Sequence, residues 1–175
     1  METQLRFHGF DPSESLVEWT PRKGETLLNI EDLESILEIQ GDEIALLLIG
    51  GVNYYSGQYL DLKKIAELGH QQGCKVGIDL AHGAGNIQPE LHESGVDFAA
   101  WCTYKYMNSG PGSLGGIFVH ERYAYDTTLK RFAGWWSQNK DTRFDMRQPL
   151  DITPGAEGWQ LSNPPILSMA AIKAS

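Results

Sequence analysis

The chain has 175 residues, of which 41% are hydrophobic and 21% are charged, and these fractions are typical of a folded globular domain. Its 14 lysine and arginine residues stand against 23 aspartate and glutamate residues, which gives a formal net charge of −9. This balance argues against a nucleic-acid partner, because neutralising phosphates requires clustered basic residues. It also argues against attachment to an anionic membrane surface.

The sequence lacks the usual signals for a membrane span, for secretion and for a metal site. Its longest apolar run, residues 44–52, is too short to cross a bilayer, and the N-terminus lacks the basic start and apolar block of a signal peptide. The two cysteines, Cys74 and Cys102, form no metal-type cluster, and the five histidines have no metal-ligand spacing. We therefore predict a reduced, soluble, cytoplasmic protein without a bound metal.

Helix and strand signals alternate along the first half of the chain. Asn29 is a good N-cap, and the apolar spacing after it predicts a helix. The unbroken apolar run 44–49 predicts a strand with both faces covered, as in a parallel sheet between helices. Residues 52–60, which carry three tyrosines, predict a loop. Asp61 then caps a second helix, which stops at Gly73.

The second half continues the alternation and then loses it. The expected elements are a strand at 76–78 that ends on Asp79, a weak helix at 89–93, strands at 96–101 and 116–120, and a helix from Glu121. This order predicts an α/β fold with a mostly parallel sheet flanked by helices. Residues 133–175 are rich in tryptophan, glycine and proline and show no clear periodicity.

Two polar groups directly follow predicted strands, where open α/β sheets bind their ligands. Asp79 follows one strand, and Thr103-Tyr104-Lys105 follows the next. A carboxylate at the end of a buried strand is costly unless it is paired, so Lys105 could pair with it, or both groups could face one ligand. Taken alone, Asp79 reads equally well as a structural acid, and an isolated lysine is more often solvated.

The glycine-rich stretch 110–115 has the formal pattern G-x-G-x-x-G. We reject a dinucleotide site, because that fingerprint lies between a strand and a helix, whereas this stretch leads into a strand. A lysine and a carboxylate on neighbouring strand ends, near aromatic residues, suit pyridoxal 5′-phosphate (PLP). The lysine forms a Schiff base with the cofactor, and the acid keeps the pyridine nitrogen protonated.

Several linked segments make the chain resemble kynureninases, which are fold-type I PLP-dependent enzymes with an aminotransferase-like large domain. The segments are HGF (8–10), PRKGETL (21–27), GVNYYSGQ (51–58), GCKVGIDLAHGAGN (73–86), GVDFAAWCTYKY (95–106), Gly134-Trp135, RFDMRQPL (143–150) and Ser162-Asn163. The resemblance runs through nearly all of the chain and matches the central portion of the family's longer subunits. It implies that residues 1–132 belong to the PLP-binding domain and that 133–175 lie in the same domain near a dimer interface.

The resemblance also implies roles for individual residues. Lys105 would carry the Schiff base and later shuttle the Cα proton of the substrate. Asp79 would bind the pyridine nitrogen, with His82 beside it supporting the ring. Tyr104 would hydrogen-bond the cofactor phosphate and assist proton transfer.

Two more residues would act across a homodimer. The resemblance implies that Trp135 and Asn163 reach the cofactor region of the partner subunit. The implied reaction is hydrolytic Cβ–Cγ cleavage of L-kynurenine or 3-hydroxykynurenine, which gives anthranilate or 3-hydroxyanthranilate plus L-alanine. The reaction belongs to tryptophan catabolism and NAD biosynthesis.

Two other interpretations remain open. The chain could belong to another fold-type I lyase of the cysteine desulfurase kind, although that group usually has histidine where Tyr104 precedes the lysine. It could also be a truncated, non-catalytic form. No glycine-rich turn opens a helix before Asp79, and no arginine matches the family's carboxylate clamp, so we expect the chain alone to be a poor enzyme or none.

Overall fold

The computed structural model describes residues 1–175, which separate into two compact units, Met1–Ile39 and Gln40–Ser175. The first unit contains α1 (Glu2–Phe7), α2 (Pro12–Ser15) and nearly all of α3 (Ile30–Gln40). Helix α3 begins directly after Asn29, as predicted, whereas the two short helices before it have no counterpart in the sequence analysis. The predicted segment 1–132 spans both units, whereas the segment 133–175 lies entirely in the second. That both segments belong to one larger domain remains a prediction.

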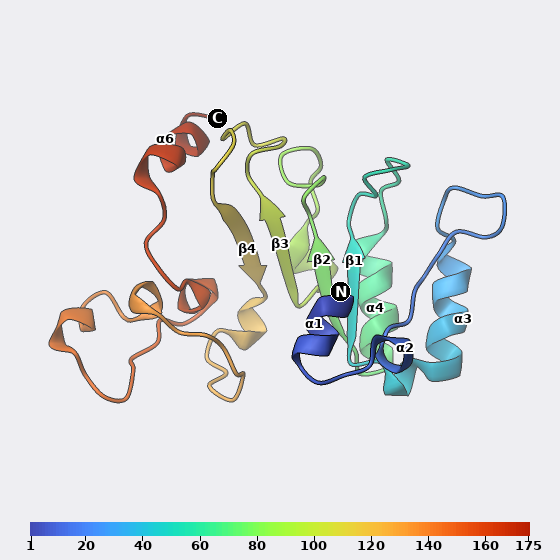
Figure 1. The fold of residues 1–175 in the computed structure, drawn as a ribbon, viewed down its shortest axis with the longest axis horizontal. Helices are drawn as coiled ribbons and strands as arrows, with labels where there is room; N and C mark the ends of the chain where they lie inside the picture. The colour runs from blue at the N-terminus through green and yellow to red at the C-terminus, as the bar shows by residue number, and fades with distance from the viewer. The chain divides into compact units, whose positions relative to one another are not determined.

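The second unit is built on one mixed sheet in the order β1-β2-β3-β4 (Figure 1). Strands β1 and β3 are each parallel to β2, and β4 is antiparallel to β3. The carboxyl ends of the three parallel strands therefore meet at one edge of the sheet, and the predicted α/β fold with a mostly parallel sheet is confirmed. The strands are β1 (Leu46–Gly50), β2 (Lys75–Asp79), β3 (Phe98–Cys102) and β4 (Gly115–Val119).

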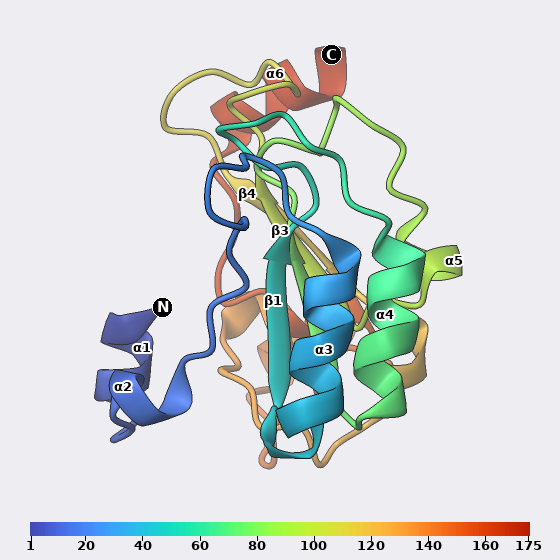
Figure 2. The same ribbon diagram turned by 90° about the vertical axis from the view of Figure 1, so that its right-hand side faces the viewer.

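Helix α4 (Leu62–Gln71) packs against one face of this sheet (Figure 2). Its side chain Ile65 is fully buried. Gly69 lets the helix approach closely, because a Cβ added there would lie 2.8 Å from the side chains of both Leu47 and Val76. The core therefore sits between α4 and the first two strands.

The start of α4 offers a direct test of the predicted cap. The Asp61 carboxylate accepts a hydrogen bond from the Lys64 N–H at 3.0 Å. Replacing Asp61 by alanine should lower the free energy of unfolding by about 1 kcal/mol, because that N–H loses its partner. Urea unfolding followed by circular dichroism measures the effect, with Lys63→Ala in the same turn as the control. Equal stabilities of the two variants would show that the cap contributes nothing.

The opposite face of the sheet is exposed at β1, so the prediction that both faces of this strand are buried was wrong. Leu46 and Leu48 are 41% and 42% exposed, and Ile117 on β4 is 45% exposed. Continuous apolar sequence shows that a face is suited to burial, but it does not show that the same chain supplies the cover. This leaves an apolar face on the side of the sheet away from α4.

The helix predicted from Glu121 is also wrong, because the structure has only a 3-10 turn at Glu121–Tyr123. The Ala124 carbonyl accepts the Gly155 N–H at 3.1 Å instead of continuing a helix. The weak helix signal near residue 90 corresponds to α5 (Leu91–Ser94), a single turn.

The last quarter contains one helix that is not predicted from the sequence. Helix α6 (Ile166–Ala174) is apolar at most positions, so it has no polar face and no helical period to detect. The remaining regular structure of this segment consists of 3-10 turns at Trp135–Ser137, Arg143–Asp145 and Ala156–Trp159. No helix combines the length and apolar character needed to cross a membrane.

Candidate functional site

The carboxyl edge of the sheet brings together Asp79, His82 and Lys105, which we call the edge cluster. Asp79 is the last residue of β2 and pairs with Gly50 on one side and Ala100 on the other. Lys105 follows β3 by three residues, and its Nζ lies 2.9 Å from Nε2 of His82. The structure thus places the predicted lysine and histidine in hydrogen-bond contact, at the same edge as the predicted acid.

A tight turn after β2 places His82 at this edge. The N–H groups of Gly83 and Ala84 both bond to the Leu80 carbonyl at 2.9 Å. The Asp79 carboxylate caps the same turn, because its Oδ1 accepts the Ala81 N–H at 2.8 Å. Asp79 therefore has a structural contact through one oxygen, while its side chain remains exposed.

Tyrosines form the rim of the edge cluster. The centre of the Tyr54 ring lies 6.2 Å from the centre of the His82 ring. The Tyr106 ring packs edge-to-face with His82, with ring centres 6.1 Å apart. Tyr104 is 51% exposed, and Lys105 Nζ lies 5.8 Å from the centre of its ring. Of the tyrosines at this rim, only Tyr104 has a role predicted from the sequence, although the three tyrosines of residues 52–60 already signal an aromatic loop near the site.

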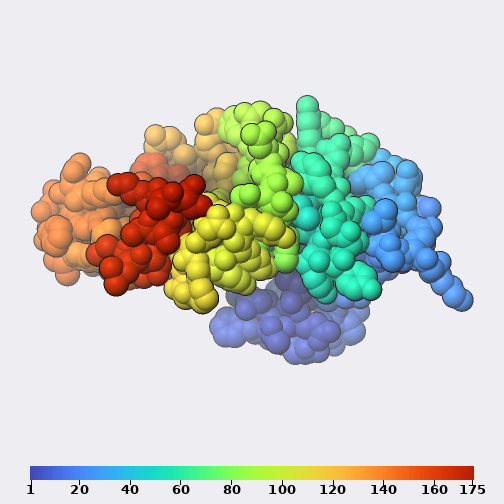
Figure 3. Space-filling view, turned by 90° about the horizontal axis from the view of Figure 1, so that it is seen from above, coloured from blue at the N-terminus to red at the C-terminus, as the bar shows by residue number.

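Three loops make up this edge when the molecule is viewed from above. Residues 52–60, 81–90 and 103–114, teal, green and yellow in Figure 3, lie side by side on the surface. Ser175, directly after helix α6, also reaches this edge, because its Oγ accepts a hydrogen bond from the Asn108 amide at 3.1 Å.

Trp135 and Asn163 do not join the edge cluster within this chain. The Trp135 ring packs edge-on against Phe144, with ring centres 5.3 Å apart. Asn163 is exposed, and its side-chain oxygen accepts from Ser162 Oγ at 3.4 Å. The segment that carries Trp135, orange in Figures 1 and 2, lies away from the carboxyl edge. Both residues are expected to act on a partner subunit, so their roles remain predictions.

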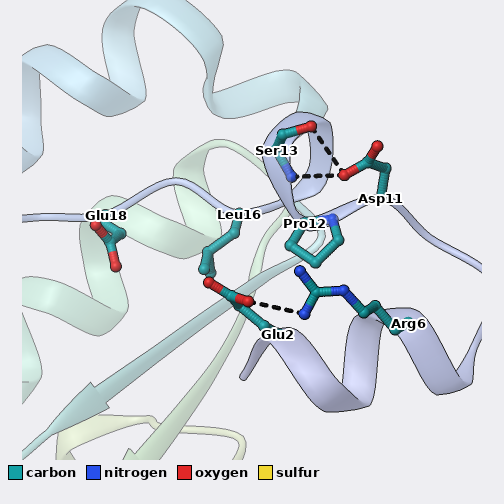
Figure 4. Close-up of a pocket in the computed structure, with 7 residues that line it drawn as sticks. All are labelled: Glu2, Arg6, Asp11, Pro12, Ser13, Leu16 and Glu18. Atoms are coloured by element: carbon teal, nitrogen blue, oxygen red, sulfur yellow. Dashed lines mark hydrogen bonds and ion pairs between the residues drawn. The ribbon is translucent and has the colours of Figure 1, made fainter.

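The structure has two hollows, and neither is lined by a residue of the edge cluster. One, of about 310 Å³, is in the first unit, where Glu2 pairs with Arg6 at 2.8 Å and Asp11 accepts from Ser13 (Figure 4). Glu2, Arg6 and Asp11 already have partners and Glu18 is exposed to solvent, so we assign no chemistry to this hollow. The other, of about 360 Å³, is apolar and lies over β3 and β4, beside Trp159.

A buried charge network occupies the opposite edge of the sheet. Asp97 is 3% exposed, and its carboxylate accepts the Val76 N–H at 2.6 Å, lies 2.9 Å from His70 Nε2, and accepts the hydroxyl of Tyr123. Burial alone would raise the pKa of Asp97, but these hydrogen bonds outweigh burial and hold the pKa below its ordinary value of 3.8. The network joins α4, β2 and the turn at Glu121–Tyr123 to the residue that precedes β3, and we assign it a structural role.

Comparison with known proteins finds one matching family and many similar sequences. The family described as "Aminotransferase class-V" matches residues 13–133. A kynureninase of Flavobacterium psychrophilum is 57% identical over 174 residues, which cover 99% of this chain and 41% of that protein. A kynureninase of Nematostella vectensis is 49% identical over 174 residues, which cover 99% of this chain and 37% of that protein. The chain therefore spans about 40% of the length of the curated relatives it matches.

Solved structures share the fold at much lower identity. A cysteine desulfurase of Thermococcus onnurineus superposes with a TM-score of 0.65 at 18% identity, over 98% of this chain and 40% of that one. An alanine–glyoxylate aminotransferase of Nostoc superposes with a TM-score of 0.59 at 19% identity, over 85% of this chain and 37% of that one. At these identities the likeness shows the fold alone, which is that of fold-type I PLP enzymes.

Proposed function

Because the chain belongs to the class-V aminotransferase family, we propose that its edge cluster forms part of a kynurenine-cleaving active site. Enzymes of this family depend on PLP. The observation that carries the proposal is the contact of Lys105 with His82 at 2.9 Å, at the strand edge where Asp79 ends β2. Identities of 49–57% to kynureninases over nearly the whole chain support the choice of reaction.

The residues of the edge cluster fit PLP. Lys105 supplies a half-buried primary amine beside an imidazole. Asp79 is exposed, and the Ala81 N–H engages only its Oδ1, so Oδ2 can accept a proton donor such as a pyridinium N–H. When bound, PLP withdraws electrons from the Cα and Cβ of an attached amino acid.

Each residue of the site would then hold or move a proton at a defined atom. Lys105 would hold the cofactor through its side-chain amine, and the same amine would take the Cα proton of the substrate. His82 would orient that amine through the hydrogen bond seen here. Asp79 would keep the ring nitrogen protonated, and Tyr104 would bond the phosphate and deliver a proton to Cβ.

The proposed overall reaction is balanced by one water molecule. Water adds to the γ-carbonyl carbon of L-kynurenine or 3-hydroxykynurenine, and the Cβ–Cγ bond breaks. The aromatic part leaves as anthranilate or 3-hydroxyanthranilate, and Cβ takes a proton to give L-alanine. We assign the reaction to tryptophan catabolism and NAD biosynthesis and place the protein in the cytoplasm.

A chimaera tests this function directly. Residues 1–175 replace the matching 41% of the Flavobacterium psychrophilum kynureninase, and anthranilate release from L-kynurenine is followed by fluorescence. We expect release by the chimaera and none by the same chimaera carrying Lys105→Ala. A folded chimaera that takes up PLP but releases no anthranilate would contradict the proposal. Sulfide release from L-cysteine, measured in parallel, would favour the desulfurase alternative.

The chain alone should not turn over L-kynurenine at the ordinary enzymatic rate of about 1 per second. PLP is usually held through its phosphate by N–H groups at a helix N-terminus. Here the first turn of α3 is acidic, and the Asp61 carboxylate occupies the start of α4. Anthranilate formation by the purified chain is the measurement. A rate near that of the chimaera would show that the chain already contains a sufficient site.

We also propose a homodimer with the segment from residue 133 near its interface. Helix α6 buries no residue, and Ile166 and Leu167 are 79% and 89% exposed. Exposed apolar side chains gathered on one element are typical of an interface. Replacing Leu167 by aspartate should shift the protein from dimer to monomer in light scattering, whereas Lys173→Ala on the same helix should not. A wild-type chain that stays monomeric at high concentration would count against the dimer.

A further inference from the structure

The loop that carries Lys105 is tied at its base by one buried side chain. Thr103 directly follows β3 and is 3% exposed. Its hydroxyl oxygen lies 2.5 Å from the Leu114 carbonyl oxygen and 2.7 Å from the hydroxyl of Ser109, which is itself 9% exposed. The Ser109 N–H also bonds to the Thr103 carbonyl at 3.2 Å. Hydrogen bonds therefore join the two ends of the segment 103–109, and Lys105 is one of the residues within that segment.

The hydroxyl groups form a directed chain. A hydroxyl donates one hydrogen bond and accepts up to two. The Leu114 carbonyl can only accept, so Thr103 donates to it, and Ser109 must then donate to Thr103. Successive hydrogen bonds of this kind strengthen one another in a buried setting. Ser113 Oγ also lies 3.2 Å from the Thr103 hydroxyl oxygen. Loss of the Thr103 hydroxyl would leave all three neighbours without this partner.

A second contact fixes the far side of the loop. Asn108 adopts a left-handed backbone conformation, with φ 58°, which turns the chain back toward Thr103. Gly85, in the loop that carries His82, has φ 79°, and a Cβ added there would lie 2.8 Å from the Tyr106 carbonyl oxygen. The loop of Lys105 therefore rests against the loop of His82, which is where their side chains meet.

We propose that Thr103 and Ser109 are positioning residues that hold the Lys105 amine at His82. Their hydroxyl pair closes the loop at its base, and the contact at Gly85 supports its other side. The meaning of this inference rests on the proposed function, in which Lys105 is the Schiff-base residue. The geometry that carries it does not involve PLP, so it can be tested without the cofactor.

Competitive acetylation tests the inference on the 175-residue chain in the absence of PLP. The chain is acetylated briefly with acetic anhydride, and mass spectrometry gives the rate at Lys105 relative to Lys63, which is exposed on α4. We expect Thr103→Val and Ser109→Ala to raise this ratio about threefold or more, because the amine is released from His82. Thr103→Ser keeps the hydroxyl and should keep the wild-type ratio.

The outcomes separate positioning from a purely structural role. If both variants lower the melting temperature but leave the ratio unchanged in folded protein, the inference is overturned. If Thr103→Val does not fold, Ser109→Ala decides by the same ratio. A parallel reaction with PLP and borohydride separates this inference from the proposed function. Failure of PLP to label Lys105 would count against the function, while the acetylation ratio would still decide whether Thr103 and Ser109 position the amine.

Discussion

Replacing Lys105 by alanine is expected to abolish the Schiff-base absorbance that the chain develops with PLP. Lys105 is the lysine of the edge cluster, half-buried and 2.9 Å from His82. An alanine leaves no amine at this position. Lys105→Arg should fail as completely, because a guanidinium does not form a Schiff base and is not interchangeable with an amine.

Absorbance spectra recorded during PLP titration give the result. Lys63→Ala, on the exposed side of α4, is the matched control and should keep the wild-type spectrum. Undiminished absorbance in Lys105→Ala would place the reactive amine elsewhere and remove the basis of the proposed site.

Replacing Asp97 by alanine is expected to lower the free energy of unfolding by about 3–5 kcal/mol, because it removes one partner of a buried charge network. The Val76 N–H, the His70 imidazole and the Tyr123 hydroxyl would all lose their shared acceptor. Urea unfolding measures the loss. Glu67→Ala on the exposed side of α4 should change stability by less than about 0.5 kcal/mol. A similarly small loss in Asp97→Ala would show that the network does not stabilise the fold.

The same carboxylate predicts how stability depends on pH. Its folded-state pKa lies below the ordinary value of 3.8, so the unfolded chain binds its proton more readily. The contribution of Asp97 is therefore complete above pH 3.8 and is lost as the pH falls through the lower folded-state value. The stability gap between wild type and Asp97→Asn should be constant near neutral pH and shrink below pH 3.8. A gap that widens toward acid would contradict this assignment.

Much of the sheet and its edge could be predicted because short apolar runs specify strands. The runs before Asp79 and Lys105 are buried strands in neighbouring positions, so both residues had to reach one edge. His82 follows from the same logic, since it lies one turn beyond β2. The contact of His82 with Lys105 could not be predicted, because it depends on how two loops rest against each other at Gly85.

The exposed face of β1, helix α6 and the buried hydroxyl pair could not be predicted. These features depend on contacts between distant segments, which local patterns do not encode. The apolar run of β1 gave no sign that Leu48 would lie on an uncovered face. Helix α6 lacks a polar face, so its sequence shows no helical period. The hydroxyl pair of Thr103 and Ser109 lies in a stretch that reads as ordinary loop sequence, and only the folded chain shows it to be buried.

The most direct test of the central claim is to map where PLP attaches. The chain is incubated with PLP, reduced with borohydride and digested, and mass spectrometry locates the phosphopyridoxyl group. The account predicts that the modification lies on Lys105, the one lysine beside His82 at the carboxyl edge of the sheet. Modification of Lys63, Lys64 or Lys75 instead, with Lys105 unmodified, would contradict it.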